Sequence, residues 1–192
     1  MPLIHQKSDT ELWMLLRKGN KIAFSILYKR HIQSLFHFGQ KLTTDQELIK
    51  DVLQELFTEF WTKRGHLSDV KQVKVYLIKS FRYKLLRTIS KANKTPIYNL
   101  DDLLKDIPEE EILENELAIE RREMLKQKLK DLPERQREVI HLRYFQNLKN
   151  DEIAEVISVN YQSVSNLLQR ALKNLKKKIT RGKAKFPLLF LF

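Results

Sequence analysis

The 192-residue sequence predicts an all-α protein of two small helical domains joined by an acidic linker, the second a helix-turn-helix domain. Only 4 glycines and 5 prolines occur, which is few turn formers for a protein of many short strands. Apolar residues recur at a helical period, and no convincing alternating strand pattern occurs. An acidic block interrupts a chain whose formal net charge is +12, which favours a polyanionic partner.

The first domain is predicted over residues 5–95, in three helical segments. Ser8-Asp9-Thr10-Glu11 has the form of a capping box, and a turn is expected at Gly19-Asn20. Thr44-Asp45-Gln46-Glu47 repeats the capping pattern and opens the clearest helix, which ends at Lys63-Arg64-Gly65. Its apolar stripe comprises Leu48, Ile49, Val52, Leu53, Leu56, Phe57, Phe60 and Trp61. A third segment follows Ser68-Asp69, with an apolar stripe of Leu77, Phe81, Leu85 and Ile89 beside the basic residues Lys84, Arg87 and Lys91.

The linker is predicted over residues 96–113. From Asn99 to Glu120 nine acidic residues face the single basic residue Lys105, and Pro96 and Pro108 punctuate the segment. Such a change of charge in a basic chain indicates a boundary between domains.

The second domain is predicted over residues 114–181. Leu125, Leu129 and Leu132 lead to Pro133, which suits the first turn of a helix. The apolar pattern continues through Val139, Ile140, Leu142 and Tyr144. Residues 150–179 then form a predicted helix-turn-helix. In it Asn150 caps a short helix with Ile153, Ala154 and Ile157, and a turn follows at Ser158-Val159-Asn160.

The second helix of this motif has two opposite faces. The apolar face comprises Val164, Leu167, Leu168, Ala171, Leu172, Leu175 and Ile179, and the polar face comprises Gln162, Asn166, Gln169, Arg170, Lys173 and Lys177. Amides pair with adenine edges, Arg with guanine and Lys with phosphates, as a helix in the major groove requires. An ordinary amphipathic helix would also have a solvated polar face, but the preceding short helix and tight turn favour DNA binding.

Four segments in this order resemble the extracytoplasmic-function sigma factors of bacterial RNA polymerase, over nearly the whole chain. They are SDTELWMLLRKGNKIAFSILYKRH, DVLQELFTEFWTKR, VYLIKSFRYKLLRTI and the stretch from LPERQREVIHLRYF to SNLLQRALKNLKK, in residues 8–31, 51–64, 75–89 and 132–177. The YQSV run is similar to members from Bacteroidetes. The resemblance implies a non-enzymatic sigma factor that binds core polymerase and directs promoter-specific initiation through the −10 and −35 elements.

The resemblance also implies roles for individual residues. The docking motif for the clamp helices of the largest polymerase subunit comprises Asp51, Gln54, Glu55 and Phe57, with Glu59 nearby; Phe57 lies in the apolar stripe and is expected in the core. The −10 segment supplies Lys79, Arg82, Tyr83, Lys84, Arg87 and Lys91. Phe81 is expected in the core, whereas Tyr83 lies off the stripe and is the better contact. The −35 residues are Tyr161, Gln162, Ser163, Ser165, Asn166, Gln169, Arg170 and Lys173.

The implied partners are core RNA polymerase, through its clamp helices and flap, promoter DNA and an anti-sigma factor. The acidic linker, including Asp101, Asp102 and Glu109 to Glu111, has two open interpretations: carboxylates that mimic a phosphate chain inside polymerase channels, or a solvated tether. The apolar tail, residues 182–192, could dock on its own second domain, bind a partner or touch lipid; we favour self-docking or disorder.

Other classes of function find less support. Without cysteines, with five histidines at no metal-ligand spacing and with no phosphate loop or nucleophile motif, the sequence predicts no enzyme, cofactor or metal site. The absence of a signal peptide and of an apolar run of about 20 residues predicts a cytoplasmic protein without stable membrane insertion. A stand-alone helix-turn-helix regulator and an anti-sigma or adaptor bundle remain as alternatives. The first lacks a recognisable sensor domain, and the second leaves the DNA-reading helix unexplained.

Overall fold

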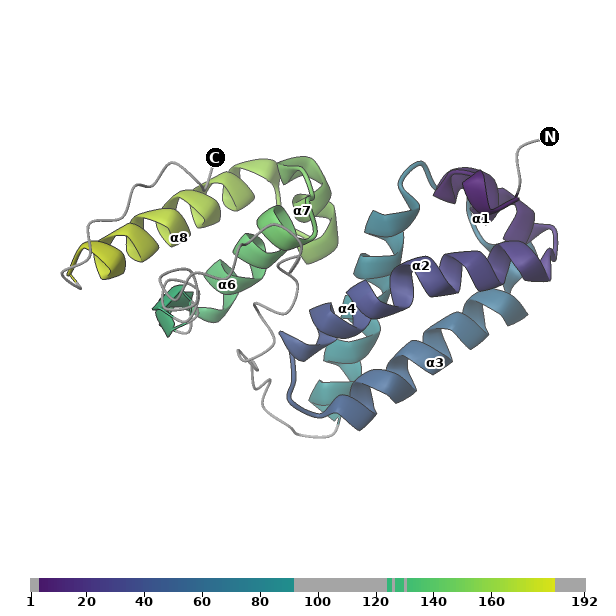
Figure 1. Ribbon diagram of the computed structural model, residues 1–192, viewed down its shortest axis with the longest axis horizontal. Helices are drawn as coiled ribbons and strands as arrows, with labels where there is room; N and C mark the ends of the chain where they lie inside the picture. The colour runs from purple at the N-terminus through teal and green to yellow at the C-terminus, as the bar shows by residue number, and fades with distance from the viewer. Residues whose placement is uncertain (1–3, 92–123, 126, 130, 182–192) are drawn as a thin grey trace, which may run out of the picture. The chain divides into compact units, whose positions relative to one another are not determined.

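The computed structural model describes residues 4–91, 124–125, 127–129 and 131–181, with side chains up to Lys177. This part of the chain is helical and contains no strand, so the predicted all-α class is confirmed. The chain divides into two compact units, of which the first holds α1 to α4 and the second holds α6, α8 and most of α7 (Figure 1). The predicted linker, the start of the second domain and the apolar tail lie outside the described residues, and their boundaries stay predictions.

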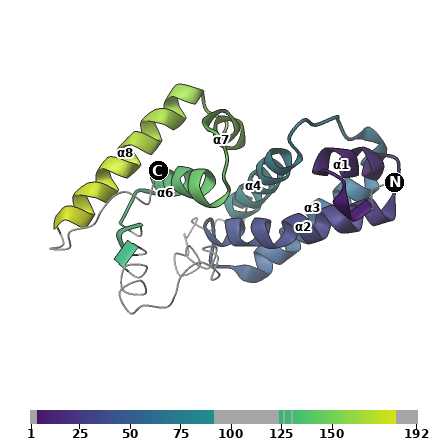
Figure 2. The same ribbon diagram turned by 45° about the horizontal axis from the view of Figure 1, so that its top comes forward.

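The first unit is a helical bundle. Its elements are η1 (Ile4–Gln6), α1 (Asp9–Arg17), α2 (Lys21–Gln40), α3 (Gln46–Thr62), η2 (Arg64–His66) and α4 (Val73–Lys91). The helices α2 and α3 lie side by side and α4 runs across them, as Figures 1 and 2 both show. None of the described helices has the length and apolar composition needed to cross a bilayer.

The core of this unit is built from the predicted apolar stripes. All four predicted stripe residues of α4, namely Leu77, Phe81, Leu85 and Ile89, are buried. Trp13 of α1 is buried as well; its ring meets Tyr76 edge-on at 5.3 Å between centroids, and its Nε1 donates to the Ser68 carbonyl oxygen at 3.0 Å. Burial of these apolar side chains stabilises the bundle, and Trp13 ties α1 to α4 and to the loop before it.

The helix starts follow the predicted capping chemistry with one correction. Ser8 caps α1 in a full capping box with Glu11, as predicted. The cap of α3 is Asp45, whose Oδ1 accepts from the Leu48 N–H at 3.0 Å, so the pattern that began at Thr44 is shifted by one residue. Asn20 caps α2 directly after Gly19, whose φ of 85° explains the predicted turn.

Asp9 ties the start of α1 to the middle of α2. Its Oδ2 lies 2.6 Å from Nε2 of the buried His31, and its Oδ1 accepts from Nη1 of Arg30 at 2.8 Å. The hydrogen bond with His31, together with Arg30, lowers the pKa of Asp9 from its ordinary 3.8 to about 2. Because the folded-state pKa is depressed, the ionised carboxylate stabilises the fold above pH 3.8, and this contribution is lost as the pH falls toward 2.

We therefore expect Asp9→Asn to lower the free energy of unfolding at neutral pH by about 1–2 kcal/mol, after allowance for solvent screening of a partly exposed carboxylate. The difference from wild type should shrink as the pH falls through 3.8 toward 2, where wild-type Asp9 also becomes neutral. Urea unfolding at a series of pH values measures this. A difference that stays constant down to pH 2 would show that Asn disturbs packing rather than an ionic contact.

The second unit is formed by α6 (Glu134–Ile140), η4 (His141–Phe145), α7 (Asn150–Ile157) and α8 (Tyr161–Arg181). The helices α6 and α8 pack together, and Asn174 Nδ2 donates to Gln136 Oε1 between them at 3.0 Å. Pro133 is the cap of α6 rather than a residue of its first turn. Of the residues in the predicted apolar pattern, Val139, Ile140 and Leu142 are buried, whereas Tyr144 is 38% exposed.

The predicted helix-turn-helix is present as α7, a short turn and α8. The cap of α7 is Lys149, not the predicted Asn150, and the Lys149 N–H donates to Glu152 Oε2 at 2.7 Å. Within α7 the buried residues include Ile153 and Ala154 as predicted, but Val156 is buried while Ile157 is half-buried. Asn160 opens α8, since its Oδ1 accepts from the Ser163 N–H at 2.7 Å.

Ser158 ends α7 in the left-handed conformation, with φ 55° and ψ 49°. Glycine is the usual residue in this conformation, because a Cβ is strained there. We therefore expect Ser158→Gly to stabilise the second unit by about 0.5–1 kcal/mol, measured by thermal unfolding. Ser165→Gly, inside α8, is the matched control and should destabilise by about the same amount. Equal signs for the two variants would contradict the expected strain at Ser158.

Candidate functional site

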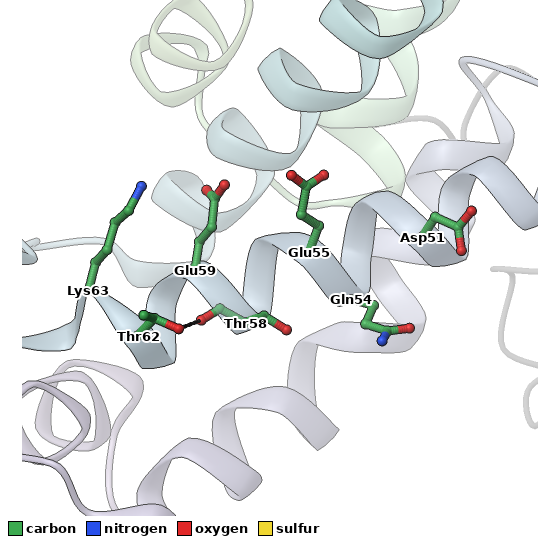
Figure 3. Close-up of a pocket in the computed structure, with 7 residues that line it drawn as sticks. All are labelled: Asp51, Gln54, Glu55, Thr58, Glu59, Thr62 and Lys63. Carbon is green, nitrogen blue, oxygen red and sulfur yellow. Dashed lines mark hydrogen bonds between the residues drawn. The ribbon is translucent and has the colours of Figure 1, made fainter.

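The exposed side of α3 forms a shallow polar groove of about 550 Å³, which we call the α3 groove (Figure 3). Its lining residues follow one another at helical spacing: Asp51, Gln54, Glu55, Thr58, Glu59, Thr62 and Lys63. The four polar residues predicted for docking are all among them. Phe57, between them in sequence, is buried as expected for a core residue, because it lies in the apolar stripe.

A cation from α4 reaches this groove. Lys84 Nζ lies 2.7 Å from Glu59 Oε1 and 3.2 Å from Glu55 Oε1, and the Lys84 side chain is only 17% exposed. The hydrogen bond from Lys84 lowers the pKa of Glu59. Burial lowers the pKa of Lys84, but the hydrogen bonds to Glu59 and Glu55 outweigh it, so that the pKa is raised. Glu59 and Lys84 are therefore both charged at neutral pH.

The remaining predicted −10 residues lie along α4. Lys79, Tyr83, Arg87 and Lys91 recur every fourth position and so form one line along the helix, with Arg82 and Lys84 on either side of it. Tyr83 is 66% exposed, Arg87 and Lys91 are exposed, and Lys79 and Arg82 are half-buried. Phe81 is buried as predicted, so the core and the exposed line occupy opposite sides of α4.

The polar face of α8 is exposed over the part of the helix whose side chains are described. Tyr161, Gln162, Asn166, Gln169, Arg170 and Lys173 are exposed, whereas Ser163 and Ser165 are half-buried. Gln162 Nε2 donates to Asn166 Oδ1 at 3.2 Å, one helical turn farther along. Val164, Leu168, Ala171 and Leu175 are buried on the opposite face, so the apolar stripe holds α8 in place while the amides and cations face solvent.

The sequence did not predict an aromatic groove of about 770 Å³ between α2 and α3, lined by residues such as Phe24, Tyr28, Phe57 and Trp61. The Tyr28 ring meets Phe57 edge-on at 4.9 Å, and the Arg64 guanidinium lies 4.7 Å from the centre of the Trp61 ring. Phe57 and Trp61 belong to the apolar stripe predicted between Leu48 and Trp61, and a stripe alone does not distinguish a core ring from one that lines a groove. The signal in the sequence is that Trp61 lies at the edge of that stripe.

Known proteins match both the second unit and the chain as a whole. Residues 122–175 match the family described as Sigma-70, region 4. The ECF RNA polymerase sigma factor SigM of Bacillus subtilis is 25% identical over 156 residues, which cover 81% of this chain and 94% of that protein. The RNA polymerase sigma-H factor of Pseudomonas aeruginosa is 22% identical over 188 residues, which cover 91% and 95%.

Solved structures share the fold. CnrH, in complex with the cytosolic domain of CnrY, aligns with a TM-score of 0.61 at 19% identity and covers 92% of this chain and 100% of that one. The sigma factor RpoE of Bartonella quintana, in complex with the anti-sigma factor NepR, aligns with a TM-score of 0.57 at 16% identity, covering 83% and 98%. The second unit therefore matches Sigma-70, region 4, and most of the chain is similar to RNA polymerase sigma factors, SigM of the ECF type among them.

Proposed function

We propose that this protein binds core RNA polymerase and directs promoter-specific transcription initiation, with the first unit docking and reading the −10 element and the second unit reading the −35 element. The observation that carries the proposal is the face of α8. Within the segment that matches sigma-70 region 4, the helix that follows the turn exposes amides and cations on one side and is anchored by apolar residues on the other.

On the −35 element, α8 lies in the major groove. Gln162, Asn166, Gln169 and Arg170 read base edges, because amides pair with adenine and Arg pairs bidentately with guanine. Lys173, farther along the helix, contacts phosphate, which positions the helix without carrying sequence information. Ser163 and Ser165 are half-buried at the edges of this face. Because their side chains are short, they contact DNA only through hydrogen bonds of their hydroxyl groups.

On the −10 element, the line of α4 holds the single strand. Arg87 and Lys91 contact the backbone, and the exposed Tyr83 offers a ring for base stacking, which is the common chemistry of single-strand binding. The α3 groove supplies the carboxylates and amide for docking on the clamp helices. The mechanism is recruitment in the cytoplasm, without catalysis by this chain.

An anti-sigma factor is a further proposed partner. Both solved structures named above were obtained with bound partners, the cytosolic domain of CnrY and the anti-sigma factor NepR. The aromatic groove between α2 and α3 offers exposed ring surface of the kind that protein partners bury.

The test is run-off transcription with purified core polymerase, with and without the protein, on genomic fragments with mapped starts. Defined starts that appear only with the protein and share two motifs at fixed spacing support the proposal. In the matched control template, half a helical turn of DNA is inserted between the motifs, which should abolish the start because the two units then face different sides of the duplex. A folded protein that neither binds core nor yields starts would instead be a stand-alone helix-turn-helix regulator.

A further inference from the structure

Lys84 lies between the two carboxylates that the proposed function uses for docking. Glu55 and Glu59 are one helical turn apart on α3, and Figure 3 shows both carboxylates on the same side of the helix. Lys84 comes from α4 and pairs with both, at 3.2 Å and 2.7 Å. In the free protein one ammonium group therefore neutralises part of the charge of two carboxylates in the α3 groove.

The cation and the two carboxylates of this cluster differ in how far their side chains are exposed to solvent. The Lys84 side chain is 17% exposed, whereas the side chains of Glu55 and Glu59 are 63% and 42% exposed. A partner can thus reach the carboxylates directly but reaches the ammonium group only if it leaves the cluster. Two carboxylates and one cation leave a net negative charge, which attracts a basic partner less strongly than the carboxylates would without Lys84.

We propose that Lys84 competes with core polymerase for Glu55 and Glu59, so that docking and DNA binding by α4 are coupled through this one side chain. The inference rests on the proposed function. When cationic groups of the polymerase pair with Glu55 and Glu59, the ion pairs of these carboxylates with Lys84 become weaker. The Lys84 ammonium group can then move away, because its four-carbon side chain is flexible. The released ammonium group then adds to the basic line of Arg87 and Lys91 as a phosphate contact.

The coupling is reciprocal. A phosphate that binds Lys84 frees Glu55 and Glu59, so DNA strengthens docking by the same factor by which docking strengthens DNA binding. The free protein consequently binds the −10 strand more weakly through α4 than the holoenzyme does. This arrangement favours DNA binding after the polymerase has been engaged.

The first measurement is the affinity for core polymerase of the wild type, Lys84→Met and Lys84→Arg, at low and high salt. Lys84→Met should bind core about two- to fivefold more tightly at low salt, because this variant lacks the ammonium group that competes for Glu55 and Glu59. The gain in affinity should vanish at high salt, where ion pairs are screened. Lys84→Arg keeps the pair and should bind like wild type. Lys63→Met is the matched control, because Lys63 lines the same groove and acts on Glu59 only through space; its gain should be smaller.

The second measurement is binding of a single-stranded oligonucleotide carrying the non-template −10 element, by free protein and by holoenzyme. Core should raise the affinity of the wild type and of Lys84→Arg more than that of Lys84→Met. Lys84→Gln is measured alongside with the same expected direction, and thermal unfolding of each variant establishes that it is folded. A Lys84→Met protein that binds core equally or more weakly, while wild type binds, overturns the competition. A wild type that does not bind core overturns the proposed function itself, and the inference with it.

Discussion

Replacing Phe81 by alanine should destabilise the first unit by about 3–5 kcal/mol, the range for removing a large buried aromatic side chain. Phe81 is fully buried, and its ring meets Phe38 edge-on at 6.4 Å between centroids. It also fills space against Gly39, where an added Cβ would lie 2.9 Å from the Phe81 ring and 2.9 Å from Ile49. The backbone of α2 thus approaches α3 and α4 closely at this point, and the surrounding helices have little freedom to close the cavity.

Differential scanning calorimetry measures this effect, because the two units can unfold in separate transitions. The transition of the first unit should move to lower temperature, while that of the second unit should not move. Tyr83→Ala, two positions along α4 and exposed, is the matched control, expected to change stability by less than about 0.5 kcal/mol. If Phe81→Ala lost as little stability as the Tyr83→Ala control, Phe81 would not be a core residue.

Replacing Arg170 by alanine should weaken binding to a matched −35 duplex by about 1–3 kcal/mol, if the guanidinium pairs bidentately with guanine. Arg170 is exposed on the face of α8 opposite the buried Leu168 and Leu175. Its planar fork is suited to two parallel hydrogen bonds, which a lysine at the same position could not reproduce.

Fluorescence anisotropy on matched duplexes and on duplexes with a single changed base pair tests this specificity. The Arg170→Ala protein should lose its preference at one base pair and retain it elsewhere. Lys173→Ala is the control for a phosphate contact, and it should weaken binding to all duplexes alike. It should also reduce the slope of log affinity against log salt concentration by about one, the value for one phosphate contact. A uniform loss for Arg170→Ala as well would make Arg170 a backbone contact.

Features that depend on neighbours in sequence were predicted well. The α4 stripe from Leu77 to Ile89 is buried, and the polar face of α8 is exposed, because both follow from the period of the helix alone. The first residues of the helices were predicted less accurately, to within one residue at α3 and α7. Thr44 and Asp45 are both good capping residues, and the chain uses Asp45 because the helix begins directly after it. At α7, Glu152 reaches the Lys149 N–H, which moves the start one residue before the expected cap.

Features that depend on helix packing were not predictable in the same way. The pairing of Lys84 with Glu55 and Glu59 joins residues far apart in sequence, and only the crossing of α4 over α3 brings them together. The sequence instead placed Lys84 in a basic stripe for DNA. The aromatic groove was not predicted for the same reason. Phe24 and Trp61 belong to different helices, and only the folded bundle brings their ring centroids to 5.2 Å from each other.

The placement of the aromatic rings has a spectroscopic consequence. Both tryptophans, Trp13 and Trp61, lie in the first unit, whereas Tyr144 and Tyr161 lie in the second. Selective excitation of indole therefore reports on the first unit alone. Trp13, enclosed in the core, should emit to the blue, whereas Trp61, half-buried beside Arg64 in the aromatic groove, should respond when a partner covers it. The unlabelled protein thus contains its own optical probe of partner binding at the first unit.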